Sequence, residues 1–389
     1  MSNTPNIRFS GFVGPWEQRK VKDIAPLQRG FDLPTSQMED GGYPVVMSNG
    51  IGGQHSHYKV KGPGIVTGRS GTIGKLHYIE DDYWPHNTTL WVTDFYGNNQ
   101  KFVYYMYQCL DLSRFSTGSG VPTLNRNDVH GELVCIPSLS EQEKISAYLT
   151  NLDHFITLNQ RKCDEMSELK KFMLQKMFPK DGEQFPEIRF NGFTAPWKLR
   201  KLEEIYQKIR NAFVGTATPY YVDSGHFYLE SNNVKDGQIN RNTEVFINDE
   251  FYEKQKDNWL HTGDLVMVQS GHVGHTAVIP ESLNNTAAHA LIIIANPIEK
   301  ISPYFVNYQF QTQNAKDSID SITTGNTINH ILASEIKRFE IVVPCFEEQS
   351  KIGEYFRQLD ILITLHQRKL DELKYFKKFM LQNMFPKKG

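Results

Sequence analysis

The sequence predicts an α+β protein: two mostly-β domains joined by two long helices that form an antiparallel coiled coil with pseudo-two-fold symmetry. Residues 5–24 recur at 186–205 with 11 of 20 identities, and residues 141–180 recur at 348–387 with 25 of 40. The segments framed by these repeats, 25–136 and 206–343, share only short islands. A duplicated frame around unlike contents indicates one scaffold that presents two different recognition surfaces.

The tail repeats have the apolar spacing of a coiled coil, in which apolar residues alternate at intervals of three and four. Polar residues interrupt this seam at the same two places in each copy: Asn159 and His366, then Lys170 and Lys377. Because a polar seam residue can fix register, we expect these positions to matter for pairing. About 38 helical residues make a rod of ~57 Å, and two such rods pack most simply on each other. The seam residues are Ile145, Leu149, Leu152, Ile156, Cys163, Met166, Met173 and Met177, then Ile352, Phe356, Leu359, Ile363, Leu370, Leu373, Met380 and Met384.

The two variable segments read as short strands rather than helices. Apolar runs such as residues 64–67 and 265–268 are bounded by turn-forming residues. Two islands align between the segments: residues 70–74 with 270–274, and Thr117-Gly118 with Thr324-Gly325. We therefore expect the two domains to share a fold and to differ in their loops, where binding residues concentrate.

The repeats divide the chain into four parts. We place the first domain at 1–137, the first long helix at 138–180, the second domain at 181–344 and the second long helix at 345–389. The repeated Trp16 and Trp197 are expected to be packing anchors between domain and helix. Lys170, Lys171, Lys377 and Lys378 could contact phosphate or pair with an acidic face of a partner, but the default expectation for all four is a solvated helix face.

Composition narrows the function classes. The chain has 389 residues and a net charge of −2, which argues against a protein that neutralises many phosphates unaided. It lacks a run of about 18 apolar residues, so no membrane partner is expected. Four widely spaced cysteines and a start without signal-peptide character indicate a cytoplasmic protein.

Catalytic motifs are missing from the sequence. The nearest match to the Asn/Asp-Pro-Pro-aromatic motif of an adenine methyltransferase is Asn296-Pro297, which lacks the second proline and the aromatic residue. A GxxxxGK[ST] phosphate loop is also missing. Neither of two histidine pairs, His55/His57 and His272/His275, has a third ligand at suitable spacing, so we expect no metal. The chain is predicted to be non-catalytic and to bind no cofactor itself.

The order of motifs resembles the specificity subunit of type I restriction-modification systems. An RFxGFxxxWxxRK opening precedes each domain, followed by an SGxxG island, a TG island, a proline with Glu-Gln, and a long helix ending in KxFMLQxMFPK. Each motif alone is short, but their order occurs twice and the resemblance covers the whole chain.

The resemblance implies that each variable segment is a target recognition domain that reads one half of an asymmetric bipartite sequence in double-stranded DNA. The two helices would act as a ruler for the spacer. Two methyltransferase subunits would dock on the chain and supply S-adenosylmethionine and adenine-N6 methylation. Two restriction subunits can then join with ATP and Mg²⁺ to form an endonuclease. The near-neutral charge fits this assembly, because partner subunits would supply much of the phosphate contact.

Candidate base readers are side chains that can pair with base edges. Arg69 and Gln269 stand out because they occupy the same aligned place and differ in type. If that place reads a base, the half-sites should differ there; the alternative is that the glycine-flanked island is a turn that maintains the fold, and the sequence does not separate the two. The candidates in the first domain are Asn49, Arg69, Ser70, Thr72, Lys75, His86 and Asn87. Those in the second are Asn232, Asn233, Gln269, Ser270, His272, Asn284 and Asn326.

Two other functions fit parts of the pattern. A non-catalytic coiled-coil scaffold whose duplicated domains bind protein or other ligands would have the same frame. A fragment of a larger single-chain enzyme is disfavoured, because no catalytic motif accompanies the frame. A gel shift with a methyltransferase partner and random-sequence DNA distinguishes the DNA reader from the scaffold.

Overall fold

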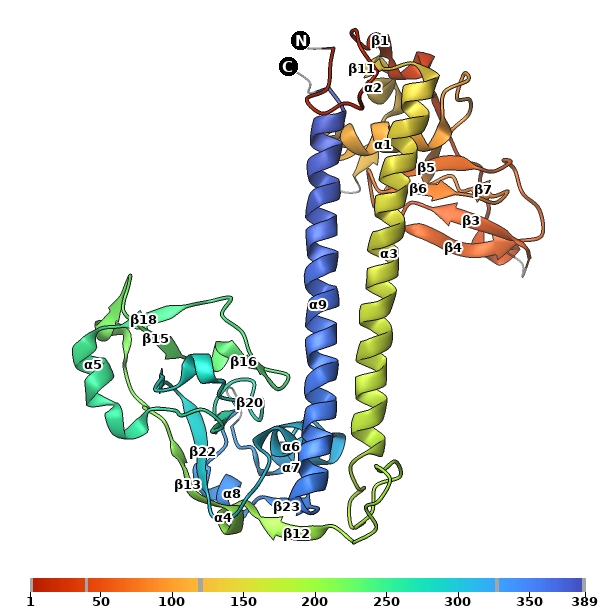
Figure 1. The fold of residues 1–389 in the computed structure, drawn as a ribbon. Coiled ribbons are helices and arrows are strands. Elements are labelled where there is room, and N and C mark those ends of the chain that lie inside the picture. Colours follow the sequence, from red (N-terminus) through yellow and green to blue (C-terminus); the bar gives the residue numbers. More distant parts are fainter. Residues whose placement is uncertain (1–2, 39–40, 118–121, 326–328, 387–389) are drawn as a thin grey trace. The chain divides into compact units, whose positions relative to one another are not determined.

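The computed structural model describes residues 3–38, 41–117, 122–325 and 329–386 (Figure 1). The chain forms two compact units: unit 1 combines residues 1–161 with 367–389, and unit 2 comprises residues 162–366. Each unit contains one variable segment and a part of both long helices. The domain boundaries assigned from the sequence remain a prediction.

Unit 1 begins with the strands of the first variable segment and continues into the first long helix, α3. Its elements are β1 (Glu17–Lys20), β2 (Leu27–Arg29), β3 (Tyr43–Met47), β4 (Gly50–His55), β5 (Gly64–Gly68), β6 (Leu76–Ile79), β7 (Trp84–Pro85), β8 (Thr89–Val92), α1 (Gln100–Cys109), β9 (Ser116–Thr117), β10 (Thr123–Leu124), α2 (Arg126–Gly131), β11 (Leu133–Ile136) and α3 (Leu139–Lys176).

Unit 2 follows the same plan and ends in the second long helix, α9. Its elements are β12 (Lys198–Lys201), α4 (Leu202–Ile205), β13 (Tyr206–Asn211), β14 (Tyr221–Val222), β15 (His226–Leu229), β16 (Val234–Lys235), β17 (Gln238–Ile239), β18 (Val245–Ile247), α5 (Asp249–Lys254), β19 (Leu265–Val268), β20 (Thr276–Val278), β21 (Ala287–Ala288), β22 (Leu291–Pro297), α6 (Pro303–Gln309), α7 (Gln313–Ile322), α8 (Ala333–Arg338), β23 (Glu340–Val343) and α9 (Phe346–Met384).

The two domains share a sheet topology. The central sheet of unit 1 has the order β2-β8-β5-β6, and that of unit 2 has the matching order β13-β22-β19-β20. A parallel pair lies beside each sheet, β3 with β7 and β15 with β21. The strands predicted at 64–67 and 265–268 are β5 and β19, and every residue of both is buried. The prediction of two mostly-β domains with one fold is confirmed.

The predicted seam forms the buried face of the helices. In unit 1, Leu149 and Leu152 of α3 share a core with Met380 and Met384 of α9. In unit 2, Met166 and Met173 of α3 pack against a core that contains Ile352, Phe356 and Leu359 of α9. Pairing of the start of one helix with the end of the other makes the pair antiparallel.

A lysine–aspartate–tyrosine triad crosses the helix pair in each unit. In unit 2, Lys170 Nζ lies 2.7 Å from Asp360 Oδ1, and the Tyr308 hydroxyl donates to Asp360 Oδ2 at 2.8 Å. Both charged side chains are nearly buried, at 13% and 11% exposure. Burial and the neighbouring carboxylate raise the pKa of Tyr308, so its hydroxyl stays a donor.

Unit 1 contains the same triad made from the other copy of each repeat. Lys377 Nζ lies 2.6 Å from Asp153 Oδ1, and the Tyr105 hydroxyl donates to Asp153 Oδ2 at 2.7 Å. The expectation that Lys170 and Lys377 lie on solvated faces is therefore wrong. Each of these two lysines pairs with an aspartate on the opposite helix. Lys171 and Lys378 are exposed, as expected.

The tryptophan of each opening repeat joins its domain to the end of a long helix. Trp16 packs edge-on against Phe102 and Phe385. Trp197 packs in the same way against Phe178 and Phe305. Both tryptophans are almost fully buried, so the predicted packing anchors are confirmed.

The arginine of each opening repeat adds a charged bond to this joint. Arg8 makes a bidentate pair with the buried Glu141, at 2.7 and 2.8 Å. Arg189 makes the same pair with Glu348, at 2.6 and 2.7 Å. The arginine and the tryptophan of each opening repeat therefore attach the domain to the long helices.

Replacing Asp360 by leucine should strongly destabilise unit 2. The change leaves the Lys170 ammonium buried without its counter-charge, and breaking a buried pair costs about 3–5 kcal/mol. The double variant Lys170→Met, Asp360→Leu removes both charges and should recover most of this loss. Urea unfolding followed by tryptophan fluorescence measures the difference, with Glu168→Gln on the exposed face of α3 as control. Equal losses in the single and double variants would contradict a charge effect.

Candidate nucleic-acid interface

Backbone hydrogen bonds join the two sequence islands of unit 1. The Leu124 N–H donates to the Arg69 carbonyl at 2.7 Å, and the Gly71 N–H donates to the Pro122 carbonyl at 3.2 Å. Ser70 and Thr123 form an isolated antiparallel bridge between these bonds. The turn after β5 and the loop before β10 therefore form one surface. Gly118 of the TG island lies outside the described residues.

Unit 2 repeats this junction with different side chains. The Ile331 N–H donates to the Gln269 carbonyl at 3.0 Å, and the Gly271 N–H donates to the Asn329 carbonyl at 3.0 Å. Ser270 and His330 form the bridge. The aligned islands are thus a common structural feature of both domains.

The glycines of the SGxxG island are required by backbone geometry. Gly71 and Gly74 have φ of +81° and +78°, and Gly271 and Gly274 have +83° and +85°. Side chains rarely adopt these angles, whereas glycine does so without steric cost. The spacing therefore encodes a turn that exposes Thr72 and His272, while Ile73 and Val273 pack against the cores of their units.

A third loop completes each surface. In unit 1 it follows β3: Lys75 Nζ donates to the Asn49 carbonyl at 2.8 Å. A Cβ on Gly68 would lie 3.1 Å from the Ser48 carbonyl oxygen, which shows how closely this loop approaches the island turn. In unit 2 it follows β15, where His272 Nε2 lies 3.1 Å from the Ser231 carbonyl and donates to it.

We name each set of three loops the loop cluster of its unit. In unit 1 it comprises residues 48–50, 69–75 and the described part of 116–124, and in unit 2 residues 231–233, 269–275 and the described part of 323–331. Among the predicted base readers, each cluster gathers the asparagine after β3 or β15 and the residues of the island turn. These are Asn49, Arg69, Ser70, Thr72 and Lys75 in unit 1, and Asn232, Gln269, Ser270 and His272 in unit 2.

Gln269 differs from its neighbours in having an unpaired buried atom. Its Oε1 is buried and has no hydrogen-bond partner among the described residues. A buried acceptor without a partner carries a desolvation cost of about 1–3 kcal/mol. This position aligns with Arg69, which is partly exposed at the same junction of unit 1.

His86 belongs to the scaffold of its domain. Its Nε2 lies 3.2 Å from the Leu33 carbonyl, and its Nδ1 lies 3.0 Å from Thr88 Oγ1. His289 occupies the matching place in unit 2, with Nε2 3.0 Å from the Gly215 carbonyl. Since both ring nitrogens of His86 bond within the domain, we assign this histidine to loop structure rather than base contact.

Asn233 is also committed within the protein. It is 2% exposed, donates from Nδ2 to the Asn240 and Thr243 carbonyls at 3.1 and 2.8 Å, and accepts from the Glu230 N–H at 3.0 Å. An amide with these bonds is not available to a base, so we leave Asn233 out of the candidate interface. Sequence could not separate it from its exposed neighbour Asn232.

The remaining candidates lie outside the loop clusters. The side chain of Asn87 donates to the Asp32 carboxylate. The Asn284 side chain accepts from the Thr262 N–H at 3.1 Å. Asn326 lies outside the described residues. The structure places Asn87 beside the island turn of unit 1, because the carbonyl of the following Thr88 accepts from the Arg69 and Ser70 N–H groups at 2.8 and 3.2 Å. Asn284 instead bonds to the segment before β19.

The histidines nearest the clusters have shifted proton affinities. Burial, with smaller contributions from His272 and two lysines opposed by Asp236, lowers the pKa of His275. Burial and the charge of Lys75 lower the pKa of His77. The paired Glu230 instead raises the pKa of His289. At neutral pH the first two rings are therefore neutral and add no cationic charge to the clusters.

The described residues contain no group of three or more His, Cys, Asp or Glu side chains that could hold a metal ion. They also contain no helix that is long and apolar enough to cross a membrane. The His55/His57 rings and the His272/His275 rings are simple aromatic neighbours, with centroids 5.7 and 5.4 Å apart.

The sequence matches one known protein family in both halves of the chain. The model of the family described as "Type I restriction modification DNA specificity domain" matches residues 14–168 and 195–375, more than half of the chain and one match in each repeat. The chain belongs to this family. We therefore call its two variable domains recognition domains from here on.

Curated relatives carry the same description. The chain is 21% identical over 275 residues to the type I restriction enzyme MjaVIII specificity subunit of Methanocaldococcus jannaschii, covering 69% of this chain and 64% of the relative. It is 22% identical to the putative MjaX specificity subunit of the same organism, covering 66% and 59%. The matches thus span less than two thirds of these two relatives. The MjaIX specificity subunit, at 20% identity, matches over 95% and 92%.

Solved structures share the fold. The S subunit of a type I restriction-modification system from M. genitalium aligns over 99% of this chain and 100% of that chain, with a TM-score of 0.67 at 14% identity. A chain from a structure on complex assembly and conformational transition of the type I R-M system aligns over 95% and 97%, with a TM-score of 0.51 at 14% identity. The fold of this chain is therefore shared with a solved S subunit.

Proposed function

We propose that this chain is the non-catalytic DNA-recognition subunit of a type I restriction-modification complex, and that each recognition domain reads one half of an asymmetric bipartite target. The observation that carries the proposal is the pair of loop clusters. Both are built by the same backbone hydrogen bonds on the same fold, and they present different side chains. This is the arrangement that two half-sites of different sequence require.

The aligned pair Arg69 and Gln269 supports different readings of the two half-sites. Arginine pairs bidentately with guanine O6 and N7, whereas glutamine pairs with adenine N6 and N7. We therefore favour guanine opposite Arg69 and adenine opposite Gln269.

The helix pair is proposed to set the spacer between the half-sites. An apolar seam tolerates a slip by one heptad, because Leu, Ile and Met fill similar holes. The two Lys–Asp pairs do not tolerate such a slip, because it would separate Lys170 from Asp360 and Lys377 from Asp153. The charged pairs thus select one register, and a fixed register gives a fixed distance.

An apolar patch on each unit is the proposed docking surface for a methyltransferase subunit. The patch residues directly precede seam positions on both helices and are 38–55% exposed. Corresponding positions of the two tail repeats supply them. They are Phe155, Leu158, Phe376 and Phe379 in unit 1, and Leu169, Phe172, Leu362 and Leu365 in unit 2. We name these sets the flank patches.

The recognition domain occupies the opposite flank of the helices. In unit 2, α6 contacts α9 through residues that directly follow seam positions: Gly353 beside Phe305, Arg357 over the Tyr304 ring, and Asp360 bonded to Tyr308. In an antiparallel pair, positions that precede the seam on both helices lie on one side, and positions that follow it lie on the other. The flank patch is therefore left uncovered by the domain.

Exposed phenylalanines and leucines in contiguous groups mark protein interaction sites. One patch in each unit suits two copies of one partner. In the proposed complex these are two methyltransferase subunits that bind S-adenosylmethionine and methylate adenine N6. Two restriction subunits with ATP and Mg²⁺ would complete the endonuclease.

The proposed function predicts one bipartite methylation motif. A host lacking its own methyltransferases would express this chain with a methyltransferase subunit of such a system, and sequencing of its methylated bases would show two half-sites around a spacer. Exchange of residues 25–136 for the matching segment of another specificity subunit should change one half-site only. A change in both would contradict two independent readers, and the lack of any motif would favour the scaffold alternative.

Deleting residues 160–166 tests the ruler. Removal of one heptad keeps the seam in phase and shortens one rod by ~10 Å, which corresponds to up to ~3 base pairs of B-DNA. Because α9 keeps its length, one of the two Lys–Asp pairs must break, so the complex should be less stable than the wild type. Where it assembles, the expected motif has the same half-sites and a shorter spacer. Deletion of three residues from the same place turns the following seam residues away from α9 and should prevent assembly. An unchanged spacer in the heptad variant would show that another element measures the distance.

Negative charge introduced into one flank patch should remove one methyltransferase subunit from the complex. The double variant Phe155→Glu, Phe376→Glu places two carboxylates in the patch of unit 1, so the complex should retain one methyltransferase subunit instead of two. Native mass spectrometry or light scattering gives the count. Arg161→Glu, on the same helix at a position away from seam and patch, is the matched control. Two bound subunits in the double variant would refute this surface.

A further inference from the structure

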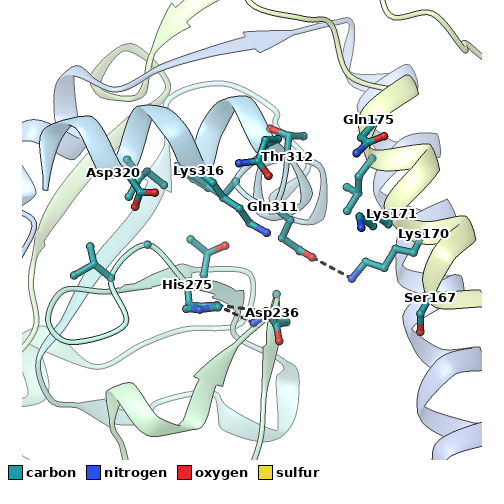
Figure 2. Close-up of a pocket in the computed structure, with 18 residues that line it drawn as sticks. Ser167, Lys170, Lys171, Gln175, Asp236, His275, Gln311, Thr312, Lys316 and Asp320 are labelled. Carbon is teal, nitrogen blue, oxygen red and sulfur yellow. Dashed lines mark hydrogen bonds and ion pairs between the residues drawn. The ribbon is translucent and has the colours of Figure 1, made fainter. Parts of the chain in front are cut away.

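A cavity of about 510 Å³ lies within unit 2, between the second recognition domain and α3, and both polar and apolar side chains line it (Figure 2). Its walls come from the last turns of α3, the turn between β16 and β17, the island turn after β19, and the segment that connects α6 with α7. Neither the proposed base contacts nor the flank patches use this cavity.

Lysines from two different elements border the cavity. Lys171 of α3 and Lys316 of α7 are exposed, and Figure 2 shows the Lys316 side chain extending toward α3. A third lysine, Lys170, already has its partners, since its ammonium bonds to Asp360 at 2.7 Å and to Gln311 Oε1 at 3.0 Å. The ammonium groups of Lys171 and Lys316 are therefore the cations that a ligand in the cavity would meet.

The N-terminal end of α7 adds positive electrostatic potential near these two lysines. Thr312 caps the helix by accepting from the Ala315 N–H at 3.3 Å, and both Thr312 and Gln313 line the cavity. The N-terminal end of a helix favours anions, because its first N–H groups point away from the helix without internal partners. The N-terminal end of α7 and the two lysines therefore both attract anions.

Two carboxylates also line the cavity. Asp236 is beside His275, with Oδ1 3.6 Å from Nδ1, and Figure 2 shows it between His275 and Lys170. Asp320 is one turn beyond Lys316 along α7, and Figure 2 shows it on the side of the cavity far from Lys171. An anion bound near Lys171 would be far from Asp320, whereas Asp236 would oppose its binding.

The cavity is continuous with the loop cluster of unit 2. Residues 273–275 of the island turn form part of its wall, while Ser270 and His272 of the same turn belong to the cluster. Asn307 fixes this relation: its Nδ2 donates to the Gly237 carbonyl at 2.9 Å, and its Oδ1 accepts from Thr276 Oγ1 at 2.8 Å. A strand of nucleic acid on the cluster would have its backbone next to the cavity.

We propose that Lys171 and Lys316 form a phosphate-binding site that holds the DNA backbone beside the second half-site. The inference rests on the proposed function. It assigns one lysine of the long helix to DNA contact, so that α3 binds the DNA that the neighbouring recognition domain reads. Such contacts position the protein and carry no sequence information.

Unit 1 has a matching cavity with different basic residues. Lys378 lines it in the place of Lys171, and Arg114, which pairs with Glu132, lines it from the domain. The two-lysine site is proposed for unit 2 alone, so its loss should affect contacts at one half-site.

The test uses the complex with its methyltransferase and a duplex that carries the motif found by methylome sequencing. Each phosphate contact contributes a slope of about 0.9 to the dependence of log K on log salt. The double variant Lys171→Gln, Lys316→Gln should lower the magnitude of this slope by about 1–2. Its affinity should fall by the same factor for the target and for duplexes with altered half-sites. Lys254→Gln, on α5 and away from the cavity, is the control.

A second arm locates the contact on the DNA. Neutral methylphosphonates, placed one at a time along the duplex, should weaken binding of the wild-type complex at one or two positions beside the second half-site. The same substitutions should have no effect on the double variant. An unchanged salt slope, or equal interference in both proteins, overturns the phosphate site while leaving the proposed function intact.

The remaining outcomes also distinguish failure of the phosphate site from failure of the proposed function. If the double variant loses methyltransferase subunits while its DNA salt slope is unchanged, the lysines face a protein, and the DNA assignment is wrong. If the wild-type complex shows no preference for any bipartite duplex, the proposed function itself fails. Lys316→Gln alone, which leaves α3 intact, guards against a variant that does not assemble.

Discussion

The rest of the structure depends on the contact between an aspartate of one long helix, a lysine of the other and a tyrosine of the adjacent domain. Lys170, Asp360 and Tyr308 form it in unit 2, and their repeat-related counterparts form it in unit 1. Apolar packing alone would hold two helices together in several registers. A charge buried at one level of the seam is costly unless its partner lies opposite, so the triad selects one register and fixes the domain to it.

Around this fixed frame, the two domains have diverged. The sheet order, the parallel strand pair and the island junction are the same in both, because each is made by backbone hydrogen bonds that accept many side chains. The residues that reach the surface at the junction are free to differ, as Arg69 and Gln269 do. A protein built in this way can change what it reads without changing how it holds its partners.

Much of this architecture could be predicted from the sequence. The helix pair, its seam, the shared β fold and the buried tryptophans followed from repeats and spacing, because periodic burial leaves a direct trace in residue order. The seam lysines were misjudged, since the aspartates that pair with them are about 190–220 residues away along the chain and only the folded helices bring them together. Asn233 and His86 could not be distinguished from exposed neighbours for the same reason: their bonding partners are set by loop geometry. The flank patches were also missed, although Phe155, Leu158 and their counterparts keep a second regular spacing beside the seam.

The division of the chain into units has a consequence for how the protein is made. Unit 2 is one continuous segment, residues 162–366, whereas unit 1 is assembled from segments on both sides of it. The core of unit 1 includes Met380, Met384 and Phe385, so it cannot close until α9 has left the ribosome. The recognition domain that is synthesised first is therefore the last to complete its core. Until then, Trp16 and Phe102 lack the aromatic ring of Phe385 that covers them in the finished protein.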